Sequence, residues 1–344
     1  MFSSWKLCLC LHNISALQSI MVKYNYIEIV FDTITYLGGF MVVEELVFVS
    51  IVHRHKNSET NLLLLIESIR RFAGSLVNTP IWVFTPDKPE KLSPKLTTKL
   101  NESNVTLIPF KINTAVRKFF FASEVEAVSL AETRALKQTK LLAWLDSNTL
   151  VLQEPSKCLI PDERSLGYRP VHHTNIGLRL DKPIDPFWTE VFRACHVTQD
   201  RIFPMTTHVD AAQIRPYFNA GFLITRPERR LFKKWHDTFF DLYQKPVFQA
   251  FYKKSRRYWI FMHQAILSGV ILASYSKDEI QELPPTYNYP LHLLAKDVSE
   301  HAPSSLEGLV TIRHEVFYRD PNWSSKMPAP ESLKTWIAKQ LYTM

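Results

Sequence analysis

Two side-chain oxygens lie two residues apart in Asp146-Ser147-Asn148, a polar triplet between two apolar runs. The run before it, 141–145, is typical of a buried strand, and the triplet predicts an abrupt turn at the strand's end. Open α/β sheets bind ligands in the crevice at such strand ends. Oxygens at this spacing can face one hard cation and, through it, a diphosphate. The alternative is an Asx-turn without chemistry, because Asp, Ser and Asn are common turn formers.

A second polar segment, Phe218-Asn219-Ala220-Gly221, interrupts an aromatic and apolar run. Glycine permits close approach of a ligand to the backbone. Asn219 offers both a donor and an acceptor for hydrogen bonds to a ligand. The alternative is a bulged strand that Asn219 stabilises.

The elements that must position these residues alternate between strand and helix from about residue 45. In the first half the periodicity predicts strands over 45–53, 80–85, 105–110 and 141–145, and helices over 60–73, 91–100 and 123–138. In the second half it predicts strands over 165–170, 217–225 and 309–314, and helices over 185–194, 227–242, 263–273 and 331–341. This alternation predicts an α/β fold with a parallel sheet and helices on its faces.

The helix over 123–138 leads into the strand that carries the triplet. Ser123 with Glu126 three residues later fits a capping box at its start. Its charged residues, Glu124, Glu132, Arg134 and Lys137, are predicted to be solvated.

The regular pattern starts at Met41, and no linker or repeat interrupts it afterwards. We therefore expect one domain over 41–344, with a regular first half over 41–152 and a less regular second half over 153–344. Residues 1–40 lack this periodicity and are interpreted as an N-terminal appendage.

The order and spacing of these short motifs, over roughly 45–323, resemble the glycogenin-like (family 8-like) glycosyltransferases. That retaining group has the Rossmann-like nucleotide-diphospho-sugar transferase (GT-A) fold. The resemblance implies a mixed, mainly parallel sheet with helices on both faces. It also implies a nucleotide-binding half over 41–152 and an acceptor and sugar half over 153–344. The family's Asp-x-Asp metal motif corresponds here to the degenerate triplet Asp146-Ser147-Asn148.

The resemblance also implies the residues that hold a metal. They are Asp146, Asn148 and a histidine near the C-terminal end, best matched by His314. Asn148 keeps an oxygen ligand but lacks the charge of the family's Asp, so Mn²⁺ or Mg²⁺ would bind weakly or be dispensable. The alternative for His314 is a strand-end histidine with a local hydrogen bond.

The donor in such families is a nucleotide-diphospho-sugar, and the resemblance implies a set of residues around it. That set is Asp146, Ser147, Asn148, Arg134, Lys137, Gly221 and Arg313. Asn219 and Gln264 are the residues expected to carry catalysis by positioning the sugar. The family's Asp-Gln at the start of a later helix is His263-Gln264 here, so a carboxylate expected at the reaction centre is missing.

Together these matches imply a hexosyltransferase-type enzyme that transfers a sugar, with retention, to a hydroxyl of a glycan, lipid or protein acceptor. The two lost carboxylates leave an alternative open. The chain would then be a catalytically impaired scaffold that binds sugar nucleotides or glycans.

Composition narrows the partners and the compartment. The net charge of +8 and pI near 9.2 favour anionic partners. Aromatic residues do not interleave with basic ones, and the basic run 253–257 is by default a solvated face, so nucleic acid is the lesser hypothesis. Four cysteines without a CxxC pair fit a reducing compartment. No apolar run reaches membrane-spanning length, so we expect a cytoplasmic protein and leave peripheral membrane contact open.

Overall fold

The computed structural model describes residues 43–112 and 115–343. The appendage predicted over 1–40 lies outside these residues. Residues 43–344 form one compact unit, which contains every element discussed below.

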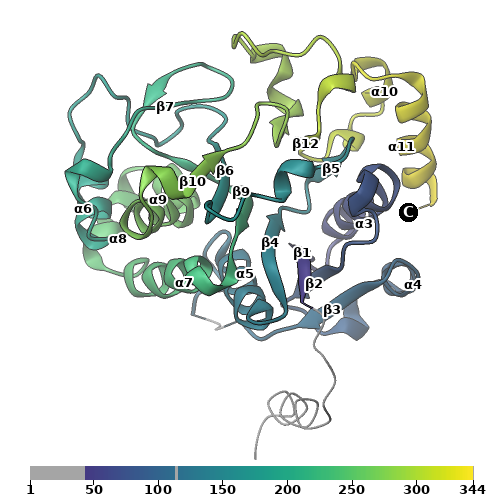
Figure 1. Ribbon diagram of the computed structural model, residues 1–344, viewed down its shortest axis with the longest axis horizontal. Coiled ribbons are helices and arrows are strands. Elements are labelled where there is room, and N and C mark those ends of the chain that lie inside the picture. Colours follow the sequence, from purple (N-terminus) through teal and green to yellow (C-terminus); the bar gives the residue numbers. More distant parts are fainter. Residues whose placement is uncertain (1–42, 113–114, 344) are drawn as a thin grey trace, which may run out of the picture. The chain divides into compact units, whose positions relative to one another are not determined.

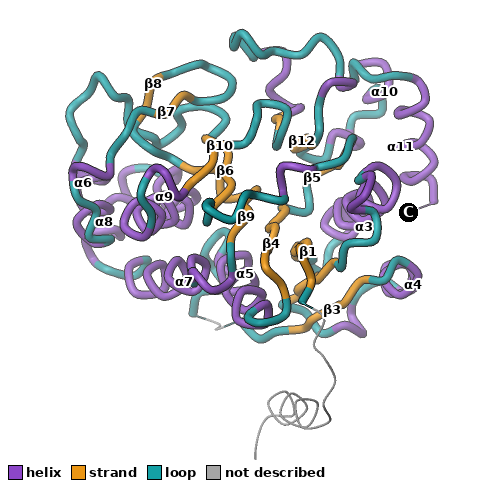
Figure 2. Tube along the Cα trace, viewed as in Figure 1, coloured by secondary structure: helices purple, strands orange, loops and turns teal. Residues whose placement is uncertain are grey.

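A seven-stranded mixed sheet forms the centre of this unit (Figures 1 and 2). Its strand order is β10-β6-β9-β4-β1-β2-β3, with β9 antiparallel to both neighbours and the remaining pairs parallel. The strands are β1 (Glu44–Ile51), β2 (Ile81–Thr85), β3 (Val105–Pro109), β4 (Thr139–Leu145), β6 (Leu166–Pro170), β9 (Phe218–Thr225) and β10 (Ile280–Glu282). The predicted α/β class with a mixed, mainly parallel sheet is therefore confirmed.

Helices cover both faces of the sheet because its strands are apolar on both sides. Along β1, Val47 and Val49 pack into one apolar core, whereas Leu46 and Phe48 pack into the other. The first core is covered by α5 (Ala122–Ala135), α6 (Pro186–Ala194), α7 (Leu231–Leu242), α8 (Pro246–Lys254) and α9 (Arg256–Ser274). The second is covered by α3 (Lys56–Phe72) and α4 (Pro94–Glu102).

A three-stranded sheet brings the late part of the chain to the end of β4. It consists of β5 (Thr149–Val151), β12 (Thr311–Arg313) and β11 (Tyr289–Pro290), with β12 antiparallel to β5. In this register Arg313 lies opposite Thr149, one residue after the triplet. Helices α10 (Trp323–Lys326) and α11 (Glu331–Thr343) follow, and α11 contributes Ile337 to a third apolar core. The short strands β7 (Met205–Thr206) and β8 (Gln213–Ile214) pair with each other.

Helix α5 differs from the prediction at both ends. Its N-cap residue is Phe121, in the left-handed region at φ 61°, and no side chain caps it. The predicted capping box is wrong: Ser123 Oγ donates to Glu124, and Glu126 contacts His236.

Glu132 of α5 is fully buried rather than solvated. Its carboxylate accepts hydrogen bonds from the backbone N–H groups of Phe232 and Lys233, at 3.1 and 2.8 Å. It thereby satisfies two N–H groups of the first turn of α7, which have no partner within the helix. Burial raises the pKa of Glu132 to about 7 despite these hydrogen bonds.

Helix α9 begins seven residues before the predicted start, so His263-Gln264 lies inside the helix and does not open it. The basic run 253–257 spans the junction between α8 and α9.

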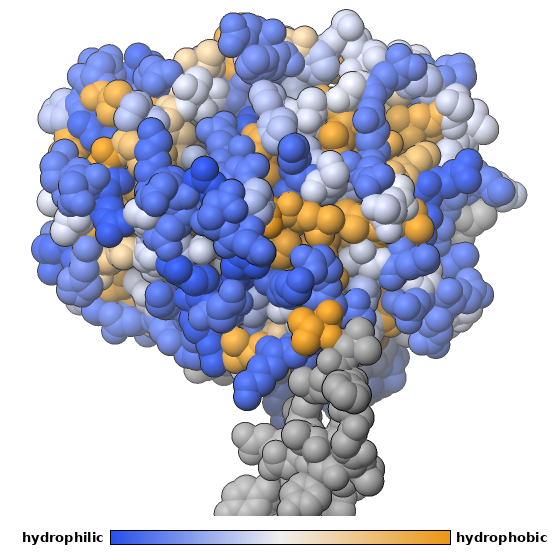
Figure 3. All heavy atoms as spheres, in the orientation of Figure 1, coloured by the Kyte–Doolittle hydropathy of each residue, from blue (hydrophilic) through white to orange (hydrophobic). Residues whose placement is uncertain are grey.

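The face drawn in Figure 3 is mostly hydrophilic, with an apolar patch that extends from its centre toward the right. Within the part of the chain that the structure describes, no helix is long and apolar enough to cross a membrane.

Candidate active site

The Asp146-Ser147-Asn148 turn joins β4 to β5. The Asp146 backbone N–H donates to Gly221 O at 2.8 Å, which ties the turn to the neighbouring strand β9. The Asn148 backbone N–H donates to Asp146 Oδ1 at 2.9 Å, so the Asx-turn that was the alternative interpretation of this triplet does form. It does not exclude chemistry, because the turn leaves Asp146 Oδ2 facing away from Asn148 and toward another group.

That group is Arg313, at the end of β12. Its Nη1 donates to Asp146 Oδ2 at 2.9 Å, and its Nε donates to Glu315. The side chains of Arg313 and Asp146 are only 17% and 19% exposed. Burial by itself would raise the pKa of Asp146, but the Arg313 charge and the Asn148 hydrogen bonds outweigh it and hold that pKa below its usual value. Both members of the pair are therefore charged at neutral pH.

Gly221 makes room for this ion pair. A Cβ at this position would lie 2.6 Å from Arg313 Nη1, 3.3 Å from Asn219 Oδ1 and 3.4 Å from Asp146 Cβ. The sequence predicted that this glycine admits a ligand to the backbone, and what approaches it here is the protein's own guanidinium.

Strand β9 is held at this point by side chains from two other elements. Gln264 Oε1 accepts the Ala220 backbone N–H at 3.1 Å, and Trp144 Nε1 donates to Ala220 O at 3.0 Å. Asn219 Oδ1 accepts the Gly221 backbone N–H at 2.9 Å. The segment lies within β9, but its register with β6 shifts here, since Tyr168 pairs with Leu223 and Pro170 pairs with Phe218. The bulged strand of the alternative interpretation therefore forms. These bonds fix the backbone from which Asn219 and Gly221 face the site.

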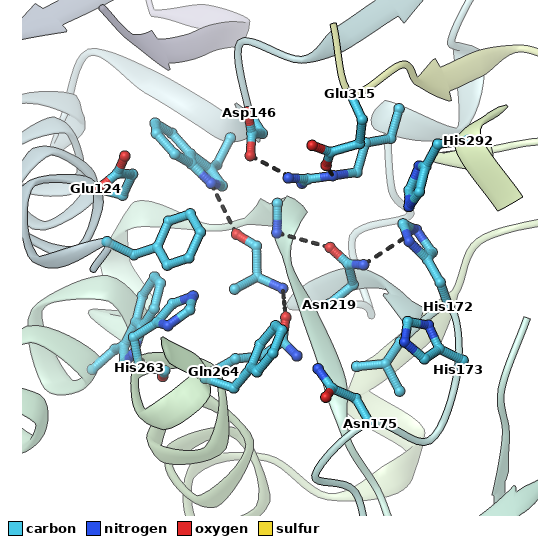
Figure 4. Close-up of a pocket in the computed structure, with 18 residues that line it drawn as sticks. Glu124, Asp146, His172, His173, Asn175, Asn219, His263, Gln264, His292 and Glu315 are labelled. Carbon is cyan, nitrogen blue, oxygen red and sulfur yellow. Dashed lines mark hydrogen bonds and ion pairs between the residues drawn. The ribbon is translucent and has the colours of Figure 1, made fainter. Parts of the chain in front are cut away.

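These residues line one pocket (Figure 4). Five of the predicted site residues contribute to it: Asp146, Asn219, Gly221, Gln264 and Arg313. Aromatic side chains form much of the remaining wall, namely Phe121, Trp144, Trp235 and Phe261. In Figure 4, His172, His173 and His292 gather on one side of the pocket next to Asn219, and Glu124 and His263 lie on the other.

Glu124 is a pocket residue that the sequence reasoning placed in solvent. It lies in the first turn of α5, and its Oε1 is 3.2 Å from His53 Nε2. Burial would raise the pKa of Glu124, but the contact with His53 outweighs it and lowers that pKa. Its position could have been anticipated, because helices that precede parallel strands begin at the same sheet edge where those strands end.

His263 stands where the family pattern has a carboxylate. Its ring stacks on Phe121 with centroids 4.4 Å apart, and its Nδ1 lies 3.0 Å from Ile260 O. Burial lowers its pKa to about 4, so the ring is neutral at physiological pH. The group is therefore an uncharged, packed ring.

The opposite wall carries histidines to which the sequence assigned no chemistry. His172 Nε2 lies 3.3 Å from Asn219 Nδ2 and 3.1 Å from Asn288 O. Burial lowers the pKa of His172 well below its usual value. His292, a residue that the sequence reasoning missed, stands 6.3 Å from His172 between ring centroids. No local motif marks these residues, which converge only in the folded chain.

The three predicted metal ligands are neighbours, but their atoms do not fit a divalent cation. Asn148 Oδ1 accepts from Asn61 Nδ2 at 2.8 Å, and Asp146 Oδ2 accepts from Arg313. His314 Nδ1 accepts the Val316 backbone N–H at 3.2 Å, so the neutral ring carries its proton on Nε2 and offers no lone pair there. Among the described residues, no group of three or more His, Cys, Asp or Glu side chains is arranged to hold a metal ion.

The structure does not bring the remaining predicted donor-binding residues into the pocket. Ser147 is buried in the turn and does not line it. Arg134 lies in the last turn of α5, at the end remote from Glu124, with its guanidinium over the Trp82 ring. Lys137 is exposed in the connection before β4, whereas the pocket lies beyond that strand's other end.

A mixed α/β sheet with a pocket at the carboxyl end of β4 is the arrangement in which open α/β proteins bind ligands. Residues 49–273 match the model of the Rhodobacterales glycosyltransferase domain. This match spans more than half of the 344 residues, so the chain belongs to that family and contains a glycosyltransferase domain.

Two solved structures illustrate the wider similarity. WbbM, a bifunctional glycosyltransferase in its apo form, aligns with a TM-score of 0.44 and 14% identity over 81% of this chain. This chain spans only 47% of the WbbM chain. The galactosyltransferase LgtC, in complex with donor and acceptor sugar analogues, aligns with a TM-score of 0.44 and 13% identity, over 78% of this chain and 87% of LgtC. No match was found among curated proteins.

Proposed function

We propose that this protein transfers a sugar from a nucleoside-diphospho-sugar to an acceptor hydroxyl, in the pocket at the end of β4. Membership of the glycosyltransferase family supports the reaction class. The observation that carries the assignment to this pocket is the convergence of Asp146, Asn219, Gly221, Gln264 and Arg313 from four separate segments.

The chemistry requires a positive charge beside the leaving diphosphate, because negative charge develops on it as the glycosidic bond breaks. Arg313 is the cationic side chain among the residues that line the pocket. Asp146 anchors it from the turn after β4. The predicted metal set does not fit a cation, so the proposed reaction includes no metal-dependent step.

The sugar would occupy the space between Asn219 and Glu124. Asn219 is 7% exposed, and its amide is oriented by Gly221 and His172. Gln264 acts as a positioning residue, because its carbonyl oxygen holds the Ala220 backbone. The Glu124 carboxylate can accept charge-assisted hydrogen bonds from the hydroxyl groups of the donor sugar.

We expect the configuration at the anomeric carbon to be retained. No carboxylate stands at position 263, where the family pattern has one, and the pocket's own carboxylates are Glu124, Asp146 and Glu315. The last two are bound to Arg313. Glu124, the third, is held by His53. The resemblance implies retention, and attack on the leaving-group face of the donor achieves it without a covalent enzyme intermediate.

The test is a screen of nucleoside-diphospho-sugars by thermal shift, followed by product analysis with glycan, lipid and peptide acceptors. A ligand at one hundred times its Kd should stabilise the protein by about 2.7 kcal/mol. Asp146→Asn, which leaves Arg313 without its buried counter-charge, should lose that shift. The proposal is wrong if no sugar nucleotide shifts the wild-type protein and none is consumed.

A second candidate is a binding scaffold without turnover. The uncharged His263 ring in place of a carboxylate is the observation that favours it. His263→Asp and Asn148→Asp separate the two. A scaffold binds sugar nucleotides but transfers nothing until these carboxylates are restored, whereas a working enzyme already transfers sugar with His263 and Asn148 in place.

A further inference from the structure

The corner where the family pattern expects a divalent cation already contains a positive charge. Arg313 Nη1 lies 2.9 Å from Asp146 Oδ2, the carboxylate oxygen that does not accept from Asn148. Gly221 leaves the space for that nitrogen, since a Cβ there would come within 2.6 Å of it. A metal ion and a guanidinium N–H cannot occupy the same side of one carboxylate oxygen.

Building on the proposed function, we propose that the Arg313 guanidinium replaces the divalent cation and binds the donor's diphosphate directly. Guanidinium presents a planar fork of N–H groups that matches phosphate oxygens, often in pairs. A diphosphate that approaches through the pocket would therefore meet a cation held in place by the protein.

The two carboxylates on Arg313 differ in burial, and this difference shows how a diphosphate gains access. Asp146 is 19% exposed and is also held by the Asn148 backbone, so it remains on Nη1. Glu315 is 38% exposed and holds Nε from the solvent side of the pocket. We infer that an incoming phosphate oxygen displaces Glu315 and takes over its hydrogen bond from Nε.

Charge accounting supports this exchange. With both carboxylates bound, the three side chains carry a net charge of −1, which repels a diphosphate. When Glu315 moves into solvent, the buried pair is neutral and its remaining N–H groups are free for the ligand. Glu315 is then a competitor for the donor site, not a ligand of a metal.

Asn148, the other oxygen ligand of the predicted metal set, is also committed elsewhere. Asn148 is held by Asn61, which in turn accepts from the Tyr318 hydroxyl at 2.7 Å. A cation that recruited Asn148 would have to break this chain of hydrogen bonds. Such a break leaves partly buried polar groups unpaired, which is unfavourable.

The experiment titrates the full chain with inorganic pyrophosphate and with UDP, by calorimetry, once in EDTA and once in MnCl2. Wild-type affinity should differ by less than about threefold between the two conditions. Arg313→Met should weaken both ligands by at least tenfold in either condition, a loss of about 1.4 kcal/mol or more. Glu315→Gln should strengthen both ligands by about three- to tenfold, because it removes a competing charge.

Arg226→Met is the matched control. Arg226 is also a largely buried arginine, paired with Asp162 at 3.2 Å, but it does not line the pocket. Its loss should lower stability without changing pyrophosphate affinity. If Arg313→Met does not fold, Glu315→Gln decides the matter, because that variant keeps the buried pair and has an expected effect of opposite sign.

Three results would overturn the inference: pyrophosphate and UDP binding that requires Mn²⁺, weaker binding by Glu315→Gln, or no binding of either ligand in any condition. These outcomes differ from failure of the proposed function. Sugar transfer that depends on Mn²⁺ would leave the function standing and refute the role of Arg313. Metal-free pyrophosphate binding through Arg313 without any sugar transfer would do the reverse.

Discussion

Gly221→Ala tests the architecture of the site with a single methyl group. Gly221 lies in extended strand β9, so alanine suits the backbone there and the effect should come from contacts alone. The added Cβ would lie 2.6 Å from Arg313 Nη1, whereas ordinary contacts begin at 3.4 Å. Arg313 must therefore retreat, and its 2.9 Å hydrogen bond to Asp146 lengthens or breaks.

The cost follows from that hydrogen bond. A buried hydrogen bond between charged groups contributes about 1.5–3 kcal/mol, and complete loss of one partner of a buried pair costs about 3–5 kcal/mol. The alanine displaces Arg313 without removing it, so we expect a loss of about 1–3 kcal/mol. In a domain of this size that lowers Tm by roughly 2–5 °C. Pyrophosphate affinity should fall about tenfold with it, because the guanidinium no longer faces the pocket at its native position.

Thermal melts and pyrophosphate titrations measure both effects. Gly308→Ala is the control, since a Cβ at Gly308 meets nothing within 4 Å and should leave Tm and affinity unchanged. Adding Gly221→Ala to Arg313→Met should cost little beyond the Arg313 change, because the clashing atom is gone. Wild-type Tm and affinity in Gly221→Ala, or full additivity in the double variant, would refute the reasoning.

Three further predictions concern the pocket and the core beside it. Glu124→Gln should weaken the donor about tenfold and lower the pKa of His53, which contact with Glu124 raises against the effect of burial. An NMR titration of His53 and donor-binding measurements test these effects. Glu126→Gln is the control, because Glu126 lies on the same helix as Glu124 and contacts a histidine, His236, but does not line the pocket. It should leave donor binding unchanged. His263→Phe should reduce the loss of folding stability at acid pH. The folded-state pKa of His263, about 4, lies below the usual 6.5, so the stability contributed by the neutral ring is complete above pH 6.5 and is lost as pH falls toward 4. Urea unfolding across that range checks it, and an unchanged slope would contradict it. Glu132→Gln should gain stability relative to the wild type by up to about 3 kcal/mol as pH rises from 4.5 to 7. The folded-state pKa of Glu132 is raised to about 7, so the stability that the protonated side chain contributes to the wild type is lost over this range. A constant difference across that range would show that Glu132 remains ionised.

The amphipathic pattern alone did not predict which side chains of α5 face the pocket or the core. Glu124 and Glu132 fall on positions that look solvated, yet one lines the pocket and the other is buried under α7. A helix wheel assumes one apolar neighbour, the sheet. Helix α5 has a second neighbour, the first turn of α7, whose unpaired N–H groups recruit a carboxylate.

The metal expectation shows a different limit of sequence reasoning. The spacing of Asp146 and Asn148 describes the ends of a turn, but it does not say what occupies the space between that turn and distant elements. Arg313 arrives there through the pairing of β12 with β5, a contact between residues more than 160 positions apart. No local pattern predicts such a contact. The position of Arg313 Nη1 nevertheless decides which cation the Asp146 carboxylate contacts.

Local patterns predicted six of the seven strands of the central sheet and the turn at Asp146, because apolar periodicity and turn-forming residues act over a few neighbours. They missed β10 and α8. Local patterns also indicated Asn219 and Gly221, and the family resemblance indicated Gln264; all three line the pocket. Only the tertiary structure decided which charge faces Asp146. The strand pairing that delivers Arg313 and the missing Cβ at Gly221 together settle that choice, and both depend on how distant segments pack.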